Sequence, residues 1–531
     1  MVDLHLLFQG FGAVLSGYNI VALVLGSFFG IIIGAIPGLT ATMGIALLVP
    51  FTFGMSPFTG IVMLLGIYTG AIYGGGIASI LIRTPGTPAA AATVFDGYPL
   101  AQKGMAGKAI GMATIASGIG GTFTALCLAF FAPILANFAL RFSAPEYFAL
   151  AVFGLSVTVT LTGKSPLKGI ISGCLGLLIA MIGLDPMGGF PRFTFGTTQL
   201  TGGFSFVPML IGLFALSEGF RQVEVILTAP KVSAVLTNIV PKLREIKECT
   251  RTFVRSCVIG LIVGVTPAIG AETACFVGYS EAKRTSKHPE LFGTGILEGV
   301  AAPQCAENAS TGGDILPMIT LGLPGDAATA VLMGALTIHN LQPGPLLFRD
   351  HLDLVHQIFA GMIMANIIFV TLGLTFARFF AKVINLDRRF LVPLIFIACM
   401  VGSYAIDNDI FDTITCVFFG FIGYIMIRYN YPVSPMVLAQ ILGVMMESNF
   451  RRSMAMSQDH LSILITRPIA VTILILAAFT TITGLRRMRK SAEMEARIAE
   501  EAAAARERAQ VVTRPPGENF PGKKANEVRD I

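Results

Sequence analysis

The sequence predicts an all-α polytopic membrane protein, and its composition is the first basis for that prediction. Of its 531 residues, 54% are hydrophobic and only 13% are charged, whereas soluble globular proteins carry about 25% charged residues. Glycine accounts for 58 residues, more than the average share of about 7%, which is typical of helices that pack closely in a bilayer. The basic residues lie in short loops between apolar runs, which is the positive-inside pattern and not a nucleic-acid-binding pattern. These features exclude a soluble enzyme.

Apolar runs of bilayer length recur along the chain, each near the 17 to 25 residues, roughly, that a membrane-spanning helix needs. They lie near 60–82, 107–134, 146–162, 167–184, 204–220, 355–378, 390–406, 410–428, 433–447 and 463–485. Four apolar stretches are interrupted midway by Pro and Gly, and they are 20–53, 61–100, 256–280 and 308–342. We expect these four to carry the function.

The interrupted stretches come in pairs, which indicates an internal repeat. The motif at 34–38 recurs 230 residues later at 264–268, and the motif at 84–90 recurs 239 residues later at 323–328. Between the two halves, segment 221–255 holds seven Lys or Arg against three Glu, so we interpret it as a cytoplasmic linker. The predicted organisation is an N-terminal segment (1–19), a first repeat (20–220), the linker (221–255), a second repeat with a final helix (256–485) and a cytoplasmic tail (486–531).

Loop charges predict that the two repeats have inverted topology. Loop 51–59 is uncharged, whereas its counterpart 283–287 is basic, and two further pairs of loops alternate in the same way. Basic loops face the cytoplasm, so equivalent loops lie on opposite sides. Inverted repeats are typical of secondary transporters, and we expect one of the elevator type.

The loop charges also predict whether each interrupted stretch crosses the membrane or turns back within it. Stretch 256–280 has basic residues at both ends, which predicts a re-entrant hairpin, and by inversion 20–53 is a hairpin from the other side. Stretches 61–100 and 308–342 change sides, so each is a spanning helix broken near the midplane. Lipid cannot satisfy unwound backbone, so the four breaks predict one central polar cavity.

The chain resembles a known family in four long segments. They are GAIPGLTATMGIALLVPFTFG (34–54), YGGGIASILIRTPGTPAAAATVFDGYPLAQKG (73–104), SKHPELFGTGILEGVAAPQCAENASTGG (286–313) and ITLGLPGDAATAVLMGALTIHNLQPGPLLF (319–348). These segments are similar to the large membrane subunit of tripartite tricarboxylate transporters. The resemblance implies a permease of the bacterial inner membrane that takes up carboxylates by secondary transport with Na⁺ or H⁺. It also implies two partners, a small four-helix membrane subunit and a periplasmic solute-binding protein.

Two positions depart from the family pattern. The second hairpin motif carries Glu272 where a small residue is usual, and Asp326 follows Pro324-Gly325 where a small hydroxyl residue is common.

Chemistry at the breaks suggests the site residues. A helix start offers free N–H groups and partial positive charge to a carboxylate, and hydroxyls add hydrogen bonds. Free N–H groups are expected at Gly86, Thr87, Gly325 and Ala327. The predicted substrate-binding set is Gly38, Thr40, Thr42, Arg83, Thr84, Pro85, Gly86, Thr87, Asn308, Pro324, Gly325 and Asp326. The alternative is that the hydroxyls only cap helices and that Arg83 snorkels or pairs with an acid.

Acids inside the membrane are costly and therefore candidates for ion coupling. The predicted set is Glu272, Glu307, Asn308, Asp314 and Asp326, and carbonyls freed at the breaks could bind Na⁺. We expect no other cofactor. The sequence holds neither a Walker A motif nor a G-x-S-x-G motif, so we expect neither ATP-driven transport by this chain nor an enzyme.

The alternative function is a stand-alone organic-anion channel or exporter that needs no binding protein, and a membrane enzyme ranks third. The basic run that starts at Arg486, after an apolar helix, predicts a cytoplasmic C-terminus. A homodimer is one option for the assembly.

Overall fold

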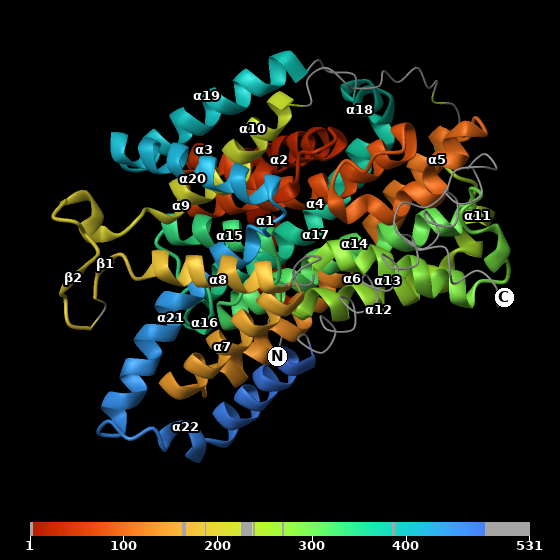
Figure 1. The fold of residues 1–531 in the computed structure, drawn as a ribbon. Coiled ribbons are helices and arrows are strands. Elements are labelled where there is room, and N and C mark those ends of the chain that lie inside the picture. Colours follow the sequence, from red (N-terminus) through yellow and green to blue (C-terminus); the bar gives the residue numbers. More distant parts are fainter. Residues whose placement is uncertain are drawn as a thin grey trace, which may run out of the picture. The chain divides into compact units, whose positions relative to one another are not determined.

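The computed structural model describes residues 4–161, 166–185, 187–224, 236, 239–267, 270–384 and 388–483. Residues up to Thr480 form one compact unit, drawn in Figure 1. Parts of the predicted linker, residues 268 and 269, and the predicted tail lie outside the described residues.

The first part of the chain is helical, with one two-residue strand pair. Its elements are α1 (Leu4–Val14), α2 (Gly17–Ala35), α3 (Ala41–Thr52), α4 (Pro57–Ile82), the 3₁₀ helix η1 (Pro88–Thr93), α5 (Val94–Gln102), α6 (Ala106–Ala139), α7 (Ala144–Leu161), α8 (Pro166–Ala180), β1 (Gly183–Leu184), β2 (Pro191–Arg192), η2 (Gln199–Gly202), α9 (Phe206–Leu210), the π-helical turn η3 (Ile211–Leu216) and α10 (Ser217–Glu224).

The second part continues in the same way. Its elements are α11 (Leu243–Glu248), α12 (Thr250–Val265), α13 (Gly270–Thr285), η4 (Pro289–Leu291), α14 (Glu298–Leu321), α15 (Ala327–Ile338), α16 (Pro345–Asp350), α17 (Leu352–Thr375), α18 (Ala377–Val383), α19 (Arg388–Asp407), α20 (Ile410–Arg428), α21 (Ser434–Met456) and α22 (Ile463–Thr466). A further apolar helix covers Pro468–Thr483.

Seven helices among the described residues are long and apolar enough to cross a membrane, which confirms an all-α polytopic membrane protein. They are Gly17–Ala35, Pro57–Ile82, Ala106–Ala139, Phe206–Glu224, Leu352–Thr375, Arg389–Asp407 and Ile410–Arg428. One predicted boundary is wrong, because α14 begins at Glu298 and not near residue 308. Its first turns carry Gln304 and Glu307, which are buried. Because these residues are polar, a search for continuous apolar runs does not detect this part of the helix.

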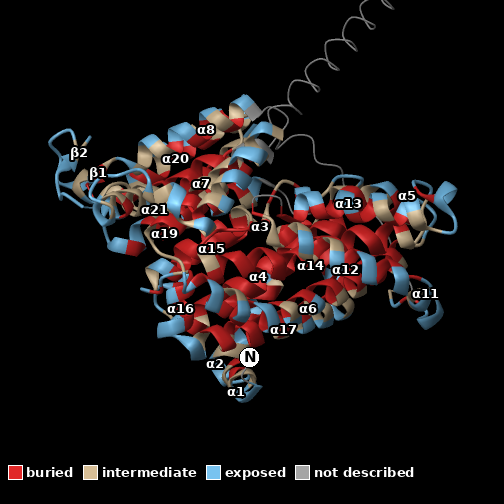
Figure 2. Cartoon of the chain, turned by 90° about the horizontal axis from the view of Figure 1, so that it is seen from below, coloured by how far each residue is buried: buried red, intermediate tan, exposed pale blue. Residues whose placement is uncertain are grey.

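Two long helices, α4 and α14, form the centre of the unit. Every residue of α4 from Gly60 to Leu81 is buried, as is every residue of α14 from Gly299 to Thr320, and Figure 2 shows both as red helices among paler ones. Both helices end at a predicted break. The chain that follows α14 is buried from Gly322 to Gly325, whereas the chain that follows α4 becomes buried only at Gly86. At both breaks the glycine of the Pro-Gly motif is thus enclosed by protein, where unwound backbone can be satisfied.

Equivalent glycines hold the same contacts in both halves. A Cβ on Gly34 of α2 would lie 2.1 Å from the carbonyl oxygen of Ala71 in α4, and a Cβ on Gly264 of α12 would lie 2.4 Å from that of Ser310 in α14. One turn earlier, Gly30 and Gly260 abut the carbonyl oxygens of Ile67 and Ala306. Each pair is related by the same offsets of 230 and 239 residues as the sequence motifs. The internal repeat is thus a repeat of helix packing as well as of sequence.

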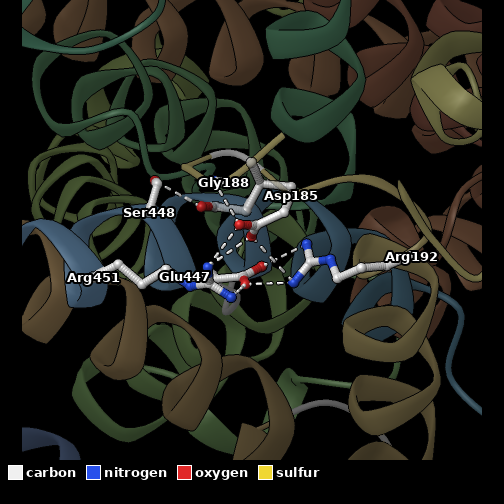
Figure 3. A network of polar contacts seen from close by, with 7 residues as sticks. Asp185, Gly188, Arg192, Glu447, Ser448 and Arg451 are labelled. Carbon is white, nitrogen blue, oxygen red and sulfur yellow. Dashed lines mark hydrogen bonds and ion pairs between the residues drawn. The ribbon is translucent and has the colours of Figure 1, made fainter. Parts of the chain in front are cut away.

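Away from this centre, an ionic network that we call the hairpin clamp joins the β1–β2 hairpin to α21 (Figure 3). It consists of Asp185, Arg192, Glu447 and Arg451. Arg192 donates to both carboxylate oxygens of Glu447, at 2.6 and 3.1 Å, and Arg451 lies 2.8 Å from both Asp185 and Glu447. The guanidinium groups and carboxylates alternate, so the clamp holds the β1–β2 hairpin against α21. This structural role accounts for the four charged residues.

Candidate functional site

All four predicted breaks are present, and each is followed by a new helix start. Helices α2, α4, α12 and α14 end at Ala35, Ile82, Val265 and Leu321, and the next helices start at Ala41, Pro88, Gly270 and Ala327. η1 passes without a gap into α5, so the second of these helices is Pro88–Gln102. The Pro-Gly motifs therefore do what the sequence predicts, since Pro ends a helix and Gly permits the turn.

The four helix starts surround one cavity of about 100 Å³. Each start supplies lining residues, and α21 adds two more. The lining consists of Thr40, Ala41 and Thr42 of the first start, Thr87, Pro88 and Ala89 of the second, Gly270, Ala271 and Glu272 of the third, Asp326, Ala327 and Ala328 of the fourth, with Ile72, Ser434 and Leu438. Helix packing closes the ring across the halves, because α3 contacts α15 and α13 contacts η1.

The first two starts are held together by backbone hydrogen bonds. The Gly38 N–H donates to the Gly86 carbonyl at 3.3 Å, and the Gly86 N–H donates to the Gly75 carbonyl at 3.2 Å. Gly38 has φ +94°, which suits glycine. The prediction of a free N–H at Gly86 is therefore wrong, because that group already has a backbone partner. Gly86 is instead a packing position, where a Cβ would lie 2.0 Å from the Gly34 carbonyl oxygen.

The helix starts differ in how their N–H groups are satisfied. Thr40 caps α3, since its hydroxyl accepts the Met43 N–H at 3.1 Å. Asp326 caps α15 with its carboxylate, which accepts the Thr329 N–H and hydroxyl, both at 2.7 Å. By contrast, the start of η1 has no side-chain cap, and the Thr87 hydroxyl is buried without a hydrogen-bond partner in the described residues. Of these three starts, that of η1 is therefore the most available to an external acceptor.

Charge around the cavity is one-sided. Its described lining contains two acids, Glu272 and Asp326, and no Lys, Arg or His. The helix starts, each equivalent to about half a unit charge, supply positive potential to the cavity.

The other predicted acids lie on α14. Asp314 is fully buried, and its Oδ2 lies 3.0 Å from the Tyr68 hydroxyl of α4. Glu307 is also fully buried, and its Oε1 accepts the Gln304 side-chain N–H at 2.8 Å. The second carboxylate oxygen of each acid has no hydrogen-bond partner in the described residues, and neither has Asn308 Oδ1. Asn308 lies inside α14, because that helix begins at Glu298.

Some predicted substrate residues are not at the cavity. Arg83 is exposed, with left-handed φ of 57°, and its guanidinium carbon lies 6.0 Å from the centre of the Tyr98 ring. Thr84 is exposed too, and neither Pro85 nor Pro324 lines the cavity. Gly325 packs against α14, where a Cβ would lie 2.5 Å from Asp314 Cα. The structure thus brings Thr40, Thr42, Thr87 and Asp326 of the predicted substrate set to the cavity wall.

Sequence reasoning missed several contributors, among them Ser434, Leu438 and Tyr68. Ser434 and Leu438 come from α21, which carries no interrupted motif, although Ser434-Pro435 is a recognisable helix start. Tyr68 is indistinguishable in sequence from a packing residue of an apolar helix.

The fold and the cavity define a helical membrane protein whose broken helices meet at a buried polar site, an architecture typical of secondary transporters. A family model described as the tripartite tricarboxylate transporter TctA family matches residues 20–438. The chain therefore belongs to that family, which is a family of transporter subunits. Membership in a tripartite system implies partner subunits.

Two relatives from Agrobacterium vitis are similar to this chain. A 52.8 kDa protein from the TAR-I ttuC′ 3′ region is 37% identical over 465 residues, which cover 88% of this chain and 93% of that protein. A protein from the TAR-II ttuC′ 3′ region is 34% identical over 226 residues, which cover 43% of this chain and 93% of that protein.

Proposed function

We propose that this chain is the permease subunit of an ion-gradient-driven system for the uptake of carboxylates, either tricarboxylates or related organic acids. The observation that carries the proposal is the uncapped start of η1, with its buried and unpaired Thr87 hydroxyl, inside a ring of four helix starts. N–H groups at helix starts favour a carboxylate, and an unpaired buried donor is costly unless a ligand satisfies it.

The cavity wall fits a small, oxygen-rich anion. Ala41, Ala89, Ala271 and Ala328 keep side chains short near the helix starts, so a ligand can approach the backbone. Hydroxyls of Thr42 and Ser434 can donate further hydrogen bonds. Because several starts point at one cavity, a molecule with two or three carboxylates can contact more than one start at once.

Transport follows from two inverted repeats around this site. The loop charges support a topology with Lys103 and Lys283 in the cytoplasm and with Ser56 and Gln342 in the periplasm. The repeated packing of α2 on α4 and of α12 on α14 supports two equivalent units, each with one hairpin and one broken helix. Movement of such units as an elevator would expose the cavity to each side in turn.

The residues proposed to couple transport to Na⁺ or H⁺ are four acids, Glu272, Glu307, Asp314 and Asp326, together with Asn308. A small four-helix membrane subunit and a periplasmic solute-binding protein complete the system, and the location is the bacterial inner membrane with the C-terminus in the cytoplasm. A homodimer is compatible with this assembly.

Radiolabelled citrate uptake into proteoliposomes tests the proposal. The expected result is gradient-driven uptake when the chain is combined with both partners. Thr87→Ala should weaken citrate binding about 2- to 13-fold, because one neutral hydrogen bond contributes roughly 0.5–1.5 kcal/mol. Thr84→Ala is the matched control, since this threonine is exposed outside the cavity.

Full-rate uptake by the chain alone would instead indicate a stand-alone transporter. Equal citrate affinity in Thr87→Ala and Thr84→Ala would place the carboxylate site away from η1.

A further inference from the structure

Three acidic or phenolic side chains from different segments meet beside the cavity. The Tyr68 hydroxyl of α4 lies 3.0 Å from Asp314 Oδ2 and 3.2 Å from Asp326 Oδ2. Tyr68 and Asp314 are fully buried, and Asp326 also lines the cavity. We call these three residues the acid triad.

The two contacts of Tyr68 can both be hydrogen bonds only if the acid triad holds one proton more than the phenol itself carries. A phenol hydroxyl carries one proton, so it donates to one carboxylate at a time. The contact with the second carboxyl group is a hydrogen bond only if that group is protonated and donates to the phenol oxygen. One added proton therefore satisfies both contacts, whereas without it two negative charges lie within roughly 6 Å of each other in a buried site, which is costly.

The surroundings offer no other neutralising charge. No ion pair in the described part of the chain involves Asp314, Asp326 or Glu272, and Glu272 adds a third acid on the cavity wall. Asp314 Oδ1 is buried with no hydrogen-bond partner among the described residues. Asp326 Oδ1 is occupied by the cap of α15. A proton shared by the two carboxyl groups needs only the two contacts through Tyr68 that are already in place.

We propose that Asp314 and Asp326, bridged by Tyr68, bind one proton that is taken up together with the substrate carboxylate. This inference rests on the proposed carboxylate transport. Asp326 stands at the cavity wall and at the start of α15, so its negative charge opposes an incoming anion at the same helix start. A proton on the pair lowers its charge from −2 to −1 and so weakens that repulsion. By linkage, the factor by which the proton raises the affinity for the anion is also the factor by which the bound anion raises the affinity for the proton.

Infrared spectroscopy of the full chain in Na⁺-free lipid tests the proton site without any substrate. The wild type should show the C=O stretch of a protonated carboxylic acid, which disappears reversibly as the pH is raised. Asp314→Asn and Asp326→Asn should each remove this band, because the remaining single carboxylate is satisfied by Tyr68 alone. Asn is as good an N-cap as Asp, so Asp326→Asn retains the start of α15.

Asp96→Asn is the matched control, because Asp96 is a fully buried acid that also accepts a hydrogen bond from a tyrosine, Tyr279, at 2.9 Å, and it lies outside the cavity and the acid triad. The band should persist in this variant. Absence of the band from the wild type, its persistence in both Asp314→Asn and Asp326→Asn, or its removal by Na⁺ at constant pH would overturn the proton assignment.

Citrate binding over a pH range in which all its carboxyls are ionised gives the second readout. Above the titration of the pair, wild-type affinity should fall by about tenfold per pH unit, as one linked proton requires. The slope should vanish in Asp314→Asn and Asp326→Asn and persist in Asp96→Asn, whereas a slope unchanged in the two triad variants would refute coupling through the triad. Absence of citrate binding in a wild type that shows the infrared band would refute the proposed transport and leave the proton site standing.

Discussion

Replacing Gly34 or Gly264 with alanine should loosen the packing that holds the breaks in place. The added Cβ would lie 2.1 Å from the Ala71 carbonyl oxygen in Gly34→Ala and 2.4 Å from that of Ser310 in Gly264→Ala. A carbon normally stays about 3.3 Å or more from a carbonyl oxygen. The helices must therefore separate by roughly 1.2 and 0.9 Å, and such overpacking costs about 1–3 kcal/mol.

The displacement should reach the cavity. The Gly34 carbonyl oxygen abuts Gly86, and Gly86 is bonded to Gly38 at the first hairpin break. A shift of α2 thus disturbs the starts of both α3 and η1. We expect the thermal unfolding temperature of the purified chain to fall in both variants, with citrate affinity reduced as well.

Gly12→Ala is the control, because Gly12 lies in α1 and an added Cβ there meets nothing within 4 Å. Differential scanning fluorimetry and citrate binding compare the three variants. If Gly34→Ala and Gly264→Ala are as stable as Gly12→Ala and bind citrate equally well, close helix packing does not hold the breaks. A large effect of only one of them would contradict the equivalence of the two halves.

Three further predictions concern topology and the periphery. Ser56→Cys and Lys283→Cys should react with membrane-impermeant thiol reagents from opposite sides, and labelling from the same side would rule out inverted repeats. The pKa of Glu245 is lowered because the Lys108 ammonium donates a hydrogen bond to it at 2.8 Å. The stabilisation by this pair is therefore fully present above the ordinary glutamate pKa and is lost as the pH falls through the lowered pKa of Glu245. The rate of hydrogen exchange in α11 should accordingly rise in acid, and this rise should be smaller in Lys108→Met. Arg192→Met should remove hydrogen bonds to a charged partner worth about 1.5–3 kcal/mol and speed proteolysis of the β1–β2 hairpin, whereas unchanged cleavage would mean that the hairpin clamp does not restrain it.

Helix breaks were predictable from sequence, because Pro and Gly act locally on the backbone. The Ile36-Pro37-Gly38 and Leu323-Pro324-Gly325 motifs each lie between the end of one helix and the start of the next. Lipid cannot satisfy unwound backbone, and the Pro-Gly motif glycines Gly86 and Gly325 are indeed buried, although Arg83 and Thr84 before the first of them are exposed. Local chemistry therefore fixed the places where the backbone unwinds.

The roles of individual atoms were not predictable, since they depend on contacts between distant segments. Gly86 has a backbone partner at Gly75, and Arg83 turns away from the cavity to lie over Tyr98. Tyr68 joins the site only because α4 and α14 pack side by side. A motif shows which residues are near a break, and tertiary packing decides which of them face the cavity.

The central claim is that a carboxylate binds where the starts of α3, η1, α13 and α15 meet. An electron cryomicroscopy structure of the chain in lipid with saturating citrate tests this claim most directly. Citrate density should lie in the cavity, with one carboxylate within hydrogen-bonding distance of the Thr87 hydroxyl and the N–H groups at the start of η1. Citrate density at any other place in the chain, with this cavity empty, would contradict the account.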